Sequence, residues 1–549
     1  MDSYLPGIAT PLSTQPPGTT AGRLGVRSPA QRREPKPTRF KPQMLLLVPA
    51  LLLGAAPSQA QLARPAQALG AGHAAVPGSG AISLEALVRQ VRESNRVILG
   101  KQAERDLALS GIDRARSAFQ PTTGLAVTNG QQRQANTYEE QLIRNNQGIY
   151  QRDGIDYSAT LSKLFETGTK VEGKVTLSKF ITNIKQQQRP GEGDDYKAFY
   201  GLTLTHPLAR DAGRDVTLAR VRVAEIEADG ARLSSLDTES TVVAEAILAY
   251  WDLALAQERL KSSEDKVGMS RRLLSEARAL NRQGRVPESD VWEVENNLTR
   301  FLAGVSEARQ GVVERANKIR TLLMALAMDA PAQLQAIDAL PTVSPKALPL
   351  EEALKLALER RGDYRQRQTV IQREDQQLRY AQNQKLPRVD LVATYGLNGL
   401  GQNESRAFAW NLMQDYPTWT FGVQASMPLG ENRQAKADVA AAQIRREDAH
   451  TQLRGLEVAI ANDIHTSIRS MEGAAERWAL WTELAQRETR QLQVERNRFN
   501  AGRSDMREIL QREERVINAQ LGVVEQQVAW ARADALVEAA RGTLLDRFK

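Results

Sequence analysis

The chain has 549 residues, of which 41% are hydrophobic, 25% charged and only 5% aromatic, a length that suits two to four ordinary domains or one elongated one. It contains no cysteine, and its four histidines are not spaced as metal ligands, so we expect no disulfide, no metal site, no cofactor and no enzymatic activity. Of the net charge of +8, residues 1–60 carry a surplus of 5 (seven Lys or Arg against two acids), which leaves 3 for the other 489 residues and disfavours a nucleic-acid partner.

The first 60 residues have the features of an export signal. Residues 44–53 read MLLLVPALLL, with basic residues before them and small residues after them, up to Ala60. This run is shorter than the roughly 20 residues that cross a bilayer, but it suits the apolar core of a secretory signal. A buried core helix is the alternative, which the Pro- and Gly-rich flanks disfavour. We therefore predict a signal over 1–60, with translation starting at Met1 or Met44, and a disordered linker over 61–82.

The same order of elements is then predicted twice, in a first repeat over 83–328 and a second repeat over 350–549. Residues 329–349, rich in proline, read as the connector between them. Each repeat reads as a helix, strands, a long helix, a tight turn and another helix. The strands are expected at about 120–130, 157–164, 171–180 and 199–208, and at about 388–397 and 418–428, with helix-hairpin tips at 281–286 and 500–505.

The long helical patterns cover about 70 residues each, which corresponds to about 105 Å at 1.5 Å per residue. No globular domain buries such a rod alone, and the faces opposite the apolar stripe are rich in Ala, Arg, Glu and Gln. This composition indicates helices packed on helices, as in a coiled coil. A long coiled-coil scaffold without any pore is therefore an alternative at this point.

The strand patterns argue against a purely helical scaffold. Over 157–164 and 171–177, apolar and polar residues alternate. This period fits a barrel wall with lipid outside and water inside, and it fits equally a half-buried sheet of a soluble protein. The connection 165–170 is short, whereas the segments 131–155, 181–198 and 398–416 are long and polar. Short turns at one side and long loops at the other are typical of a transmembrane barrel.

Taken together, these elements resemble the outer-membrane efflux protein (TolC-like) family. The likeness covers most of 83–546 and rests on the duplicated order, on strand ends followed by Pro-Leu (207–208 and 428–429), and on the tips NRQGRVPESDV and RFNAGRSDMREIL. The resemblance implies an α+β fold, internally duplicated and trimeric, in which long antiparallel helical hairpins form an α-barrel continuous with a transmembrane β-barrel. It also implies a place in the outer membrane with a large periplasmic portion.

The resemblance implies a passive exit channel of a tripartite efflux pump or a type I secretion system. Such a duct is opened by docking of a periplasmic adaptor (membrane fusion protein), while an inner-membrane transporter supplies the energy. The implied partners are therefore two further copies of the chain, the adaptor, the transporter and outer-membrane lipid. The alternatives from other classes are a periplasmic adaptor and an exported coiled-coil scaffold protein.

The spacing of the prolines at the strand ends departs from the family pattern. Pro121 and Pro207 are 86 positions apart, whereas the corresponding Pro387 and Pro428 are 41 apart. The surplus contains the alternating hairpin 157–180. The family has two strands per half, hence twelve in a trimer. If the hairpin joins the wall, a trimer has eighteen strands and a wider lumen; the alternative is a hairpin outside the wall.

The resemblance implies two groups of candidate site residues. The helices just after the tip glycines line the periplasmic aperture in the family, and Asp290 and Glu508, each six residues past its glycine, occupy matching positions. Gln511 falls where a further acid can occur. Ordinary solvated surface acids are the alternative, with Glu288 and Asp505 equally good candidates. The residues expected to dock the adaptor are Gly284, Arg285, Val286, Gly502, Arg503 and Ser504, and the glycines are expected to have positive φ in a sharp helix reversal.

Overall fold

The computed structural model describes residues 80–324, 334–344, 348–412 and 416–548. The chain divides into two units, residues 1–72 and 73–549, and all described residues lie in the second. The predicted signal over 1–60, most of the linker over 61–82 and parts of the connector over 329–349 lie outside the described residues. The architecture is therefore that of the second unit alone.

The helices and strands run in two series. The first series is β1 (Ala81–Ile82), α1 (Leu84–Ser94), α2 (Arg96–Arg116), the 3₁₀ helix η2 (Ser117–Phe119), β2 (Thr122–Ala135), α3 (Tyr138–Ile143), β3 (Ile149–Leu164), β4 (Lys170–Thr182), α4 (Asn183–Gln188), β5 (Asp195–Pro207), α5 (Arg214–Thr217), α6 (Ala219–Arg282) and α7 (Glu288–Leu322). The second series is β6 (Gln335–Ala336), α8 (Leu350–Arg360), α9 (Gly362–Gln384), β7 (Arg388–Gly401), α10 (Glu404–Leu412), β8 (Pro417–Ser426), α11 (Arg433–Asn500), α12 (Met506–Ala540) and the 3₁₀ helix η3 (Leu544–Phe548).

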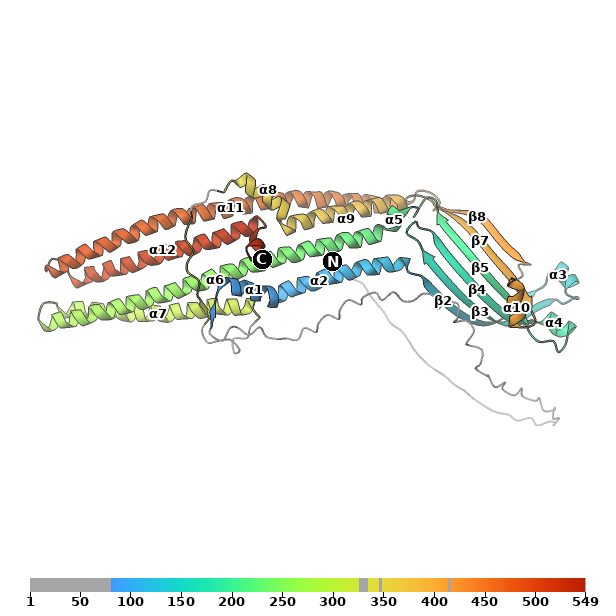
Figure 1. The fold of residues 1–549 in the computed structure, drawn as a ribbon, viewed down its shortest axis with the longest axis horizontal. Coiled ribbons are helices and arrows are strands. Elements are labelled where there is room, and N and C mark those ends of the chain that lie inside the picture. Colours follow the sequence, from blue (N-terminus) through green and yellow to red (C-terminus); the bar gives the residue numbers. More distant parts are fainter. Residues whose placement is uncertain (1–79, 325–333, 345–347, 413–415, 549) are drawn as a thin grey trace, which may run out of the picture. The chain divides into compact units, whose positions relative to one another are not determined.

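The long helices form two antiparallel hairpins, α6 with α7 and α11 with α12 (Figure 1). Helix α6 has 64 residues and α11 has 68, which corresponds to about 96 and about 102 Å of helix. Helix α12 packs on both α11 and α6, while α9 lies between α6 and α11, and α2 lies beside α6. The buried apolar residues gather in three clusters along these helices, so each rod is covered by helical neighbours rather than by a globular domain.

The single helix predicted at the start of each repeat is in fact two helices. In the first repeat the break is at the buried Asn95, whose side-chain oxygen accepts a hydrogen bond from the Val97 amide at 2.9 Å and whose Nδ2 donates to the Leu322 carbonyl at 2.9 Å. In the second repeat the break is at Arg361, which has an extended backbone. Capping by a buried side chain stabilises a new helix start at Asn95, an effect that helical periodicity does not report.

All six long strands form one antiparallel sheet in the order β2-β3-β4-β5-β7-β8. The hairpin predicted over 157–180 is therefore part of this sheet, between β2 and β5. A separate pair joins β1 and β6 in parallel, so residues 81–82, predicted as linker, are a short strand. In Figure 1 the sheet lies at the opposite end of α6 and α11 from the two hairpin tips.

Several strands are longer than predicted. Strand β3 begins at Ile149 rather than at 157, and β2 continues to Ala135, which pairs with Ile149. Both ends of the segment 131–155, expected to be a loop, are therefore strand, with α3 between them, and so is the start of 398–416. The backbone hydrogen bonds of a ladder continue where apolar and polar side chains do not alternate, so a search for alternating hydrophobicity ends the strand too early.

Candidate functional site

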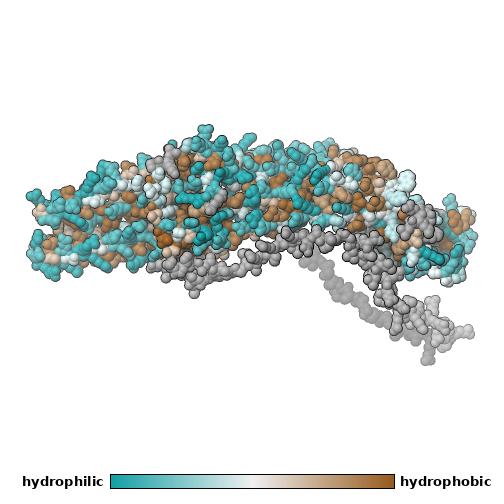
Figure 2. All heavy atoms as spheres, in the orientation of Figure 1, coloured by the Kyte–Doolittle hydropathy of each residue, from teal (hydrophilic) through white to brown (hydrophobic). Residues whose placement is uncertain are grey.

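The strand register brings apolar side chains to one face of the sheet. Two rows on this face, each crossing all six strands, contain Leu125, Ala159, Val175, Tyr200, Leu397 and Pro417, and then Thr123, Leu161, Gly173, Leu202, Tyr395 and Trp419. Side chains on this face are open to the surroundings: Leu125 is 78% exposed and Trp419 72%, and Phe421 of the next row on the same face is 69% exposed. Figure 2 shows hydrophobic residues gathered over the part of the sheet near β7 and β8, whereas hydrophilic residues dominate the surface near the helix tips. A contiguous apolar face of this kind indicates contact with another apolar surface.

The opposite face of the same strands is polar. One row across it contains Thr122, Ser162, Glu172, Thr203, Thr394 and Thr420. The Thr122 and Ser162 hydroxyls are 2.8 Å apart, and those of Thr203 and Thr394 are 3.1 Å apart. The Phe199 ring lies on this face over two glycines, because a Cβ built on Gly201 or Gly396 would overlap it. The sheet thus separates an apolar side from a polar side.

Helix α10 covers the apolar face near one end of β5 and β7. The Phe408 and Tyr200 rings are 5.5 Å apart between centroids, and Ala198 and Ala407 are completely buried. The approach is close enough that a Cβ on Gly401 would be 2.6 Å from the Ala407 nitrogen. The apolar face is therefore bounded at this end by a short helix lying on it.

The strands continue into helices through junctions that are tied to each other. After β5, the amide of Asp211 donates to the Asn383 side chain at 2.8 Å, and Gln384 Nε2 donates to an Asp211 carboxylate oxygen at 2.6 Å. Asn383 and Gln384 end helix α9, just before β7. The Leu208 amide also donates to the Val389 carbonyl at 2.7 Å. These bonds hold the junction after β5 and the junction before β7 together.

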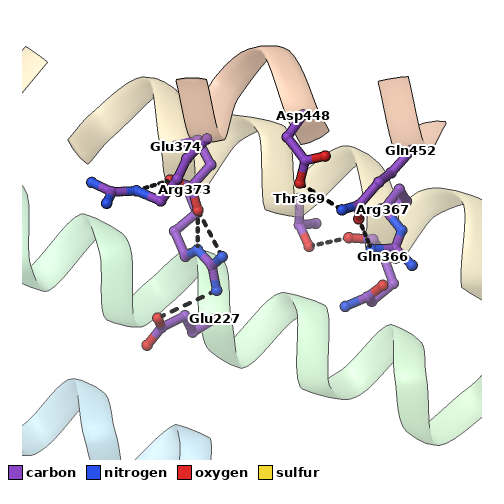
Figure 3. Close-up of polar contacts among 9 residues, drawn as sticks. Glu227, Gln366, Arg367, Thr369, Arg373, Glu374, Asp448 and Gln452 are labelled. Carbon is purple, nitrogen blue, oxygen red and sulfur yellow. Dashed lines mark hydrogen bonds and ion pairs between the residues drawn. The ribbon is translucent and has the colours of Figure 1, made fainter. Parts of the chain in front are cut away.

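Charged residues set the position of α9 between α6 and α11 (Figure 3). Glu374 is 3% exposed; it accepts a hydrogen bond from Arg373 and forms an ion pair with Arg445 at 3.4 Å. Arg373 also reaches Glu227 of α6 at 4.0 Å. Because a buried carboxylate without its cations is strongly destabilising, this network favours one register of the three helices over the others.

The two tips have the same backbone geometry. Gly284 has a φ of 71° and Gly502 a φ of 70°, so the predicted positive φ is confirmed at both. The amide of Arg285 donates to the Leu280 carbonyl and that of Arg503 to the Arg498 carbonyl, each at 2.9 Å. This is the hydrogen-bond pattern in which a left-handed glycine ends a helix.

The tip side chains are accessible in the single chain. Arg285 and Arg503 are exposed, while Val286 and Ser504 are half-buried. The Asn281 side chain supports the first tip, because its Nδ2 donates to the Val286 carbonyl at 2.9 Å. Both tips therefore present an exposed arginine on a hydrogen-bonded turn.

The predicted aperture residues lie at the starts of α7 and α12. Glu508 accepts a hydrogen bond from Arg512 Nε at 2.9 Å, and Asp290 accepts one from the Ser289 hydroxyl at 3.3 Å. Gln511 is exposed. Within the described ranges, no hydrogen bond or ion pair connects Asp290 with Glu508, so a single chain does not bring the two acids together.

Other charged residues near the tips have contacts that sequence reasoning missed. Asp505, weighed as an equal candidate, is the N-cap of α12 and accepts from the Glu508 amide at 2.8 Å. Arg507 forms an ion pair with Glu293 at 2.9 Å, which links α12 to α7. The four-residue spacing of Glu508 and Arg512 is visible in the sequence, but the Arg507–Glu293 contact joins helices that are distant along the chain.

The part of the chain that the structure describes contains no group of three or more His, Asp or Glu side chains placed to hold a metal ion. In those same ranges, none of the helices combines the length and the apolar character needed to cross a membrane.

Comparisons with known proteins agree with the geometry. Residues 353–543 match the family described as outer membrane efflux protein. A search of curated proteins gave no match. Among solved structures, the outer-membrane channel OprN superposes with a TM-score of 0.61 at 16% identity, covering 84% of this chain and 90% of that one.

Two further structures share the fold. The CmeC outer membrane channel of Campylobacter jejuni has a TM-score of 0.60 at 12% identity, over 84% of this chain and 86% of its own. The outer membrane protein VceC of Vibrio cholerae has a TM-score of 0.59 at 15% identity, over 84% of this chain and 96% of its own. At these identities the likeness shows a common fold.

Proposed function

We propose that this chain, which is related to the outer-membrane efflux protein (TolC-like) family through the match over residues 353–543, is an outer-membrane efflux channel. Three copies form a passive exit duct of a tripartite pump or a type I secretion system, with the sheet in the outer membrane and the long helices in the periplasm. The observation that carries this proposal is the sheet with one apolar and one polar face, continued by long helices.

The edges of the sheet support closure by further copies. Strands β2 and β8 end the six-stranded order, and every residue of both is exposed. An open edge leaves backbone N–H and C=O groups unpaired, which lipid does not tolerate because it supplies no hydrogen-bond partner. Pairing of β8 in one copy with β2 in the next satisfies these groups all around a ring, and the family resemblance supplies the number three.

The helices next to these edges carry exposed apolar residues. Helix α2 precedes β2 and exposes Leu107 (70%) and Leu109 (50%), while α11 follows β8 and exposes Ile444 (66%) and Val458 (62%). In a ring, α11 of one copy meets α2 of the next along the same boundary as the strands. Burial of these side chains stabilises the trimer by roughly 25 cal/mol for each Å² of apolar surface covered.

The tips and the adjoining helix starts are the proposed sites of gating. An adaptor grips the two turns through Arg285, Val286, Arg503 and Ser504, held by Gly284 and Gly502. Three copies bring Asp290, Glu508 and Gln511 around the threefold axis at the periplasmic end, where the charges of the two acids attract cations. Docking that spreads the hairpins opens this end, and an inner-membrane transporter supplies the cargo and the energy.

The test is the state of the purified full chain. We expect a protein that needs detergent for extraction from the outer membrane, has the mass of three chains by light scattering, and gives discrete conductance steps in planar bilayers. A detergent-free monomer without conductance would contradict the channel and favour an exported scaffold. Replacement of Leu107 and Ile444 by glutamate should shift the trimer toward monomer, because it places charges at the proposed boundary.

A further inference from the structure

We infer that the β3–β4 hairpin is a full part of the channel wall, so that three copies close a barrel of eighteen strands, wider than the helical tube below it. This inference rests on the proposed function, and it adds the width and the lining of the lumen. Three features of the structure carry it: the register, the two faces of the hairpin, and the anchoring of its turn.

The hairpin is paired along nearly its whole length on both sides. Strand β3 pairs with β2 from Ile149 to Ser162, and β4 pairs with β5 from Lys170 to Phe180. Among the described strands, no ladder joins β2 to β5 directly. Removing the hairpin from the wall therefore requires breaking two complete ladders and forming a new one between β2 and β5.

The hairpin also has the same two faces as the other strands. On the apolar face, Tyr157 and Leu161 of β3 and Val175 and Leu177 of β4 continue the rows of their neighbours. The opposite face carries polar residues, namely Asp156, Ser158, Thr160 and Ser162 of β3 and Glu172, Lys174, Thr176 and Ser178 of β4. A hairpin outside a barrel does not need an apolar face and a polar face that continue those of the neighbouring strands. A strand in the barrel wall needs both, because one face meets lipid and the other meets the lumen.

The short turn of the hairpin is anchored at the junction of strands and helices. Glu166 forms an ion pair with Arg214 at 2.7 Å, and the Thr169 hydroxyl is 2.8 Å from His206 Nδ1. Gly168, with a φ of 87°, fits so closely that a Cβ there would be 2.7 Å from the Asp211 carbonyl oxygen. The turn is thus held at the level where β5 passes into α5 and α6.

The turn joins β3 directly to β4, so neither strand continues into a long helix there. Helix α2 precedes β2 and α6 follows β5, and these two helices stay in contact through pairs such as Arg116–Glu225 at 2.7 Å. Their strands, in contrast, are separated by β3 and β4. Each copy therefore supplies six strands above four adjoining helix ends, and the wall has to widen from the helices to the sheet.

The size of this widening can be calculated from sheet geometry. Strands about 4.8 Å apart and tilted by about 40° each occupy about 6.3 Å of circumference. Twelve strands then give a backbone diameter of about 24 Å and eighteen about 36 Å. The extra strands also add Asp156, Glu172 and Lys174 to the lumen in each copy, so the wider section has a charged lining.

Disulfide mapping tests this arrangement, because the chain has no cysteine of its own. Leu125, Ala159, Val175 and Tyr200 lie in one row on four successive strands. In the outer membrane we expect Leu125→Cys with Ala159→Cys, and Val175→Cys with Tyr200→Cys, to form bonds within one chain and lose nearly all free thiol. The matched control, Leu125→Cys with Tyr200→Cys, should keep its thiols, since three strand spacings, about 14 Å, exceed disulfide reach.

Bonds between copies separate this inference from the proposed function. Leu125→Cys combined in turn with Trp419→Cys, Phe421→Cys and Val423→Cys should join β2 to β8 of the next copy and give covalent trimers on gels. If these trimers form but the control pair bonds instead of the hairpin pairs, the barrel has twelve strands and the inference is wrong while the channel stands. If no combination gives a bond between copies, the ring itself is contradicted.

Discussion

At the scale of single residues, glycine is required at the two tips because of the backbone conformation and not because of crowding. A Cβ on Gly502 would meet no atom within 4 Å, yet its φ of 70° is one that L side chains rarely adopt. We expect Gly502→Val to destabilise the chain by about 1–2 kcal/mol, the cost of a left-handed residue. The same substitution at Gly304, inside α7 and equally uncrowded, should instead stabilise slightly, since valine has the better helix propensity.

Thermal unfolding followed by circular dichroism checks both signs. Because the altered turn is also the proposed docking point, Gly502→Val should reduce export in cells while trimers still form, and Gly304→Val should leave export unchanged. Normal export in a trimeric Gly502→Val variant would argue against docking at this tip.

The pKa of Asp237 in α6 predicts how the stability of the chain depends on pH. Burial, and then the negative charge of Asp363, hold the pKa of Asp237 above its usual value. A raised pKa in the folded state means that the ionised form opposes folding: the contribution of Asp237 to stability is present at acidic pH and is lost as pH rises through the folded pKa. We therefore expect Asp237→Asn to raise the melting temperature at pH 7, by an amount that shrinks as the pH falls toward 4.

Asn keeps an oxygen that accepts the backbone hydrogen bond from Asp363. The exposed Asp438 of α11 is a suitable control, because its replacement by asparagine should leave the melting temperature nearly unchanged at every pH. A melting temperature at pH 7 that is lower for Asp237→Asn than for the parent chain would contradict the argument from burial.

At the scale of elements, strand β8 allows the two faces of the sheet to be compared directly. Phe421 lies on the apolar face and its neighbour Thr420 on the polar face. A lysine at a lipid-facing position costs about 2–4 kcal/mol near the bilayer midplane, whereas one in a water-filled lumen costs little. Phe421→Lys should therefore reduce the heat-modifiable, membrane-inserted form on gels, and Thr420→Lys should not. Equal loss in both variants would indicate that neither face meets lipid.

The helix elements also explain why the aperture residues are hard to identify from sequence. Acidic residues are favoured at helix N-termini by the helix dipole, and Glu288, Asp290 and Glu508 all lie in first turns. Asp505 illustrates the point, because it caps α12. An acid at these positions is thus expected on local grounds as well as for a role at an aperture.

At the scale of the whole molecule, the proposed role of the acidic residues at the aperture can be tested only in the trimer. In one chain the charge of Glu508 is partly balanced by Arg512, which also donates to Gln491 at 2.6 Å. Three copies place at least three such carboxylates in a ring, where like charges attract cations from solution. We expect Asp290→Asn combined with Glu508→Gln to weaken block by divalent cations in planar bilayers. Unchanged conductance and unchanged block would exclude the ring.

Much of the architecture was predictable because it follows from local sequence patterns. The long helices, the reversal at Gly284 and Gly502, and the alternation in 157–164 depend on residues close together in the chain. The early start of β3 was not predictable, because residues 149–156 mix apolar and polar side chains on both faces and form a strand through pairing with β2. The division of the first helix at Asn95 likewise depends on a carbonyl more than 200 residues away.

The sequence by itself determined the type of the long elements and their order along the chain, because hydrophobic spacing and turn chemistry act over a few residues. Only the tertiary structure decided which strands are neighbours. In the structure, β3 and β4 lie between β2 and β5, and the turn that joins them contacts Arg214 and His206. Strand pairing joins backbone groups that are distant along the chain, and side-chain patterns alone do not specify which of several compatible edges they meet.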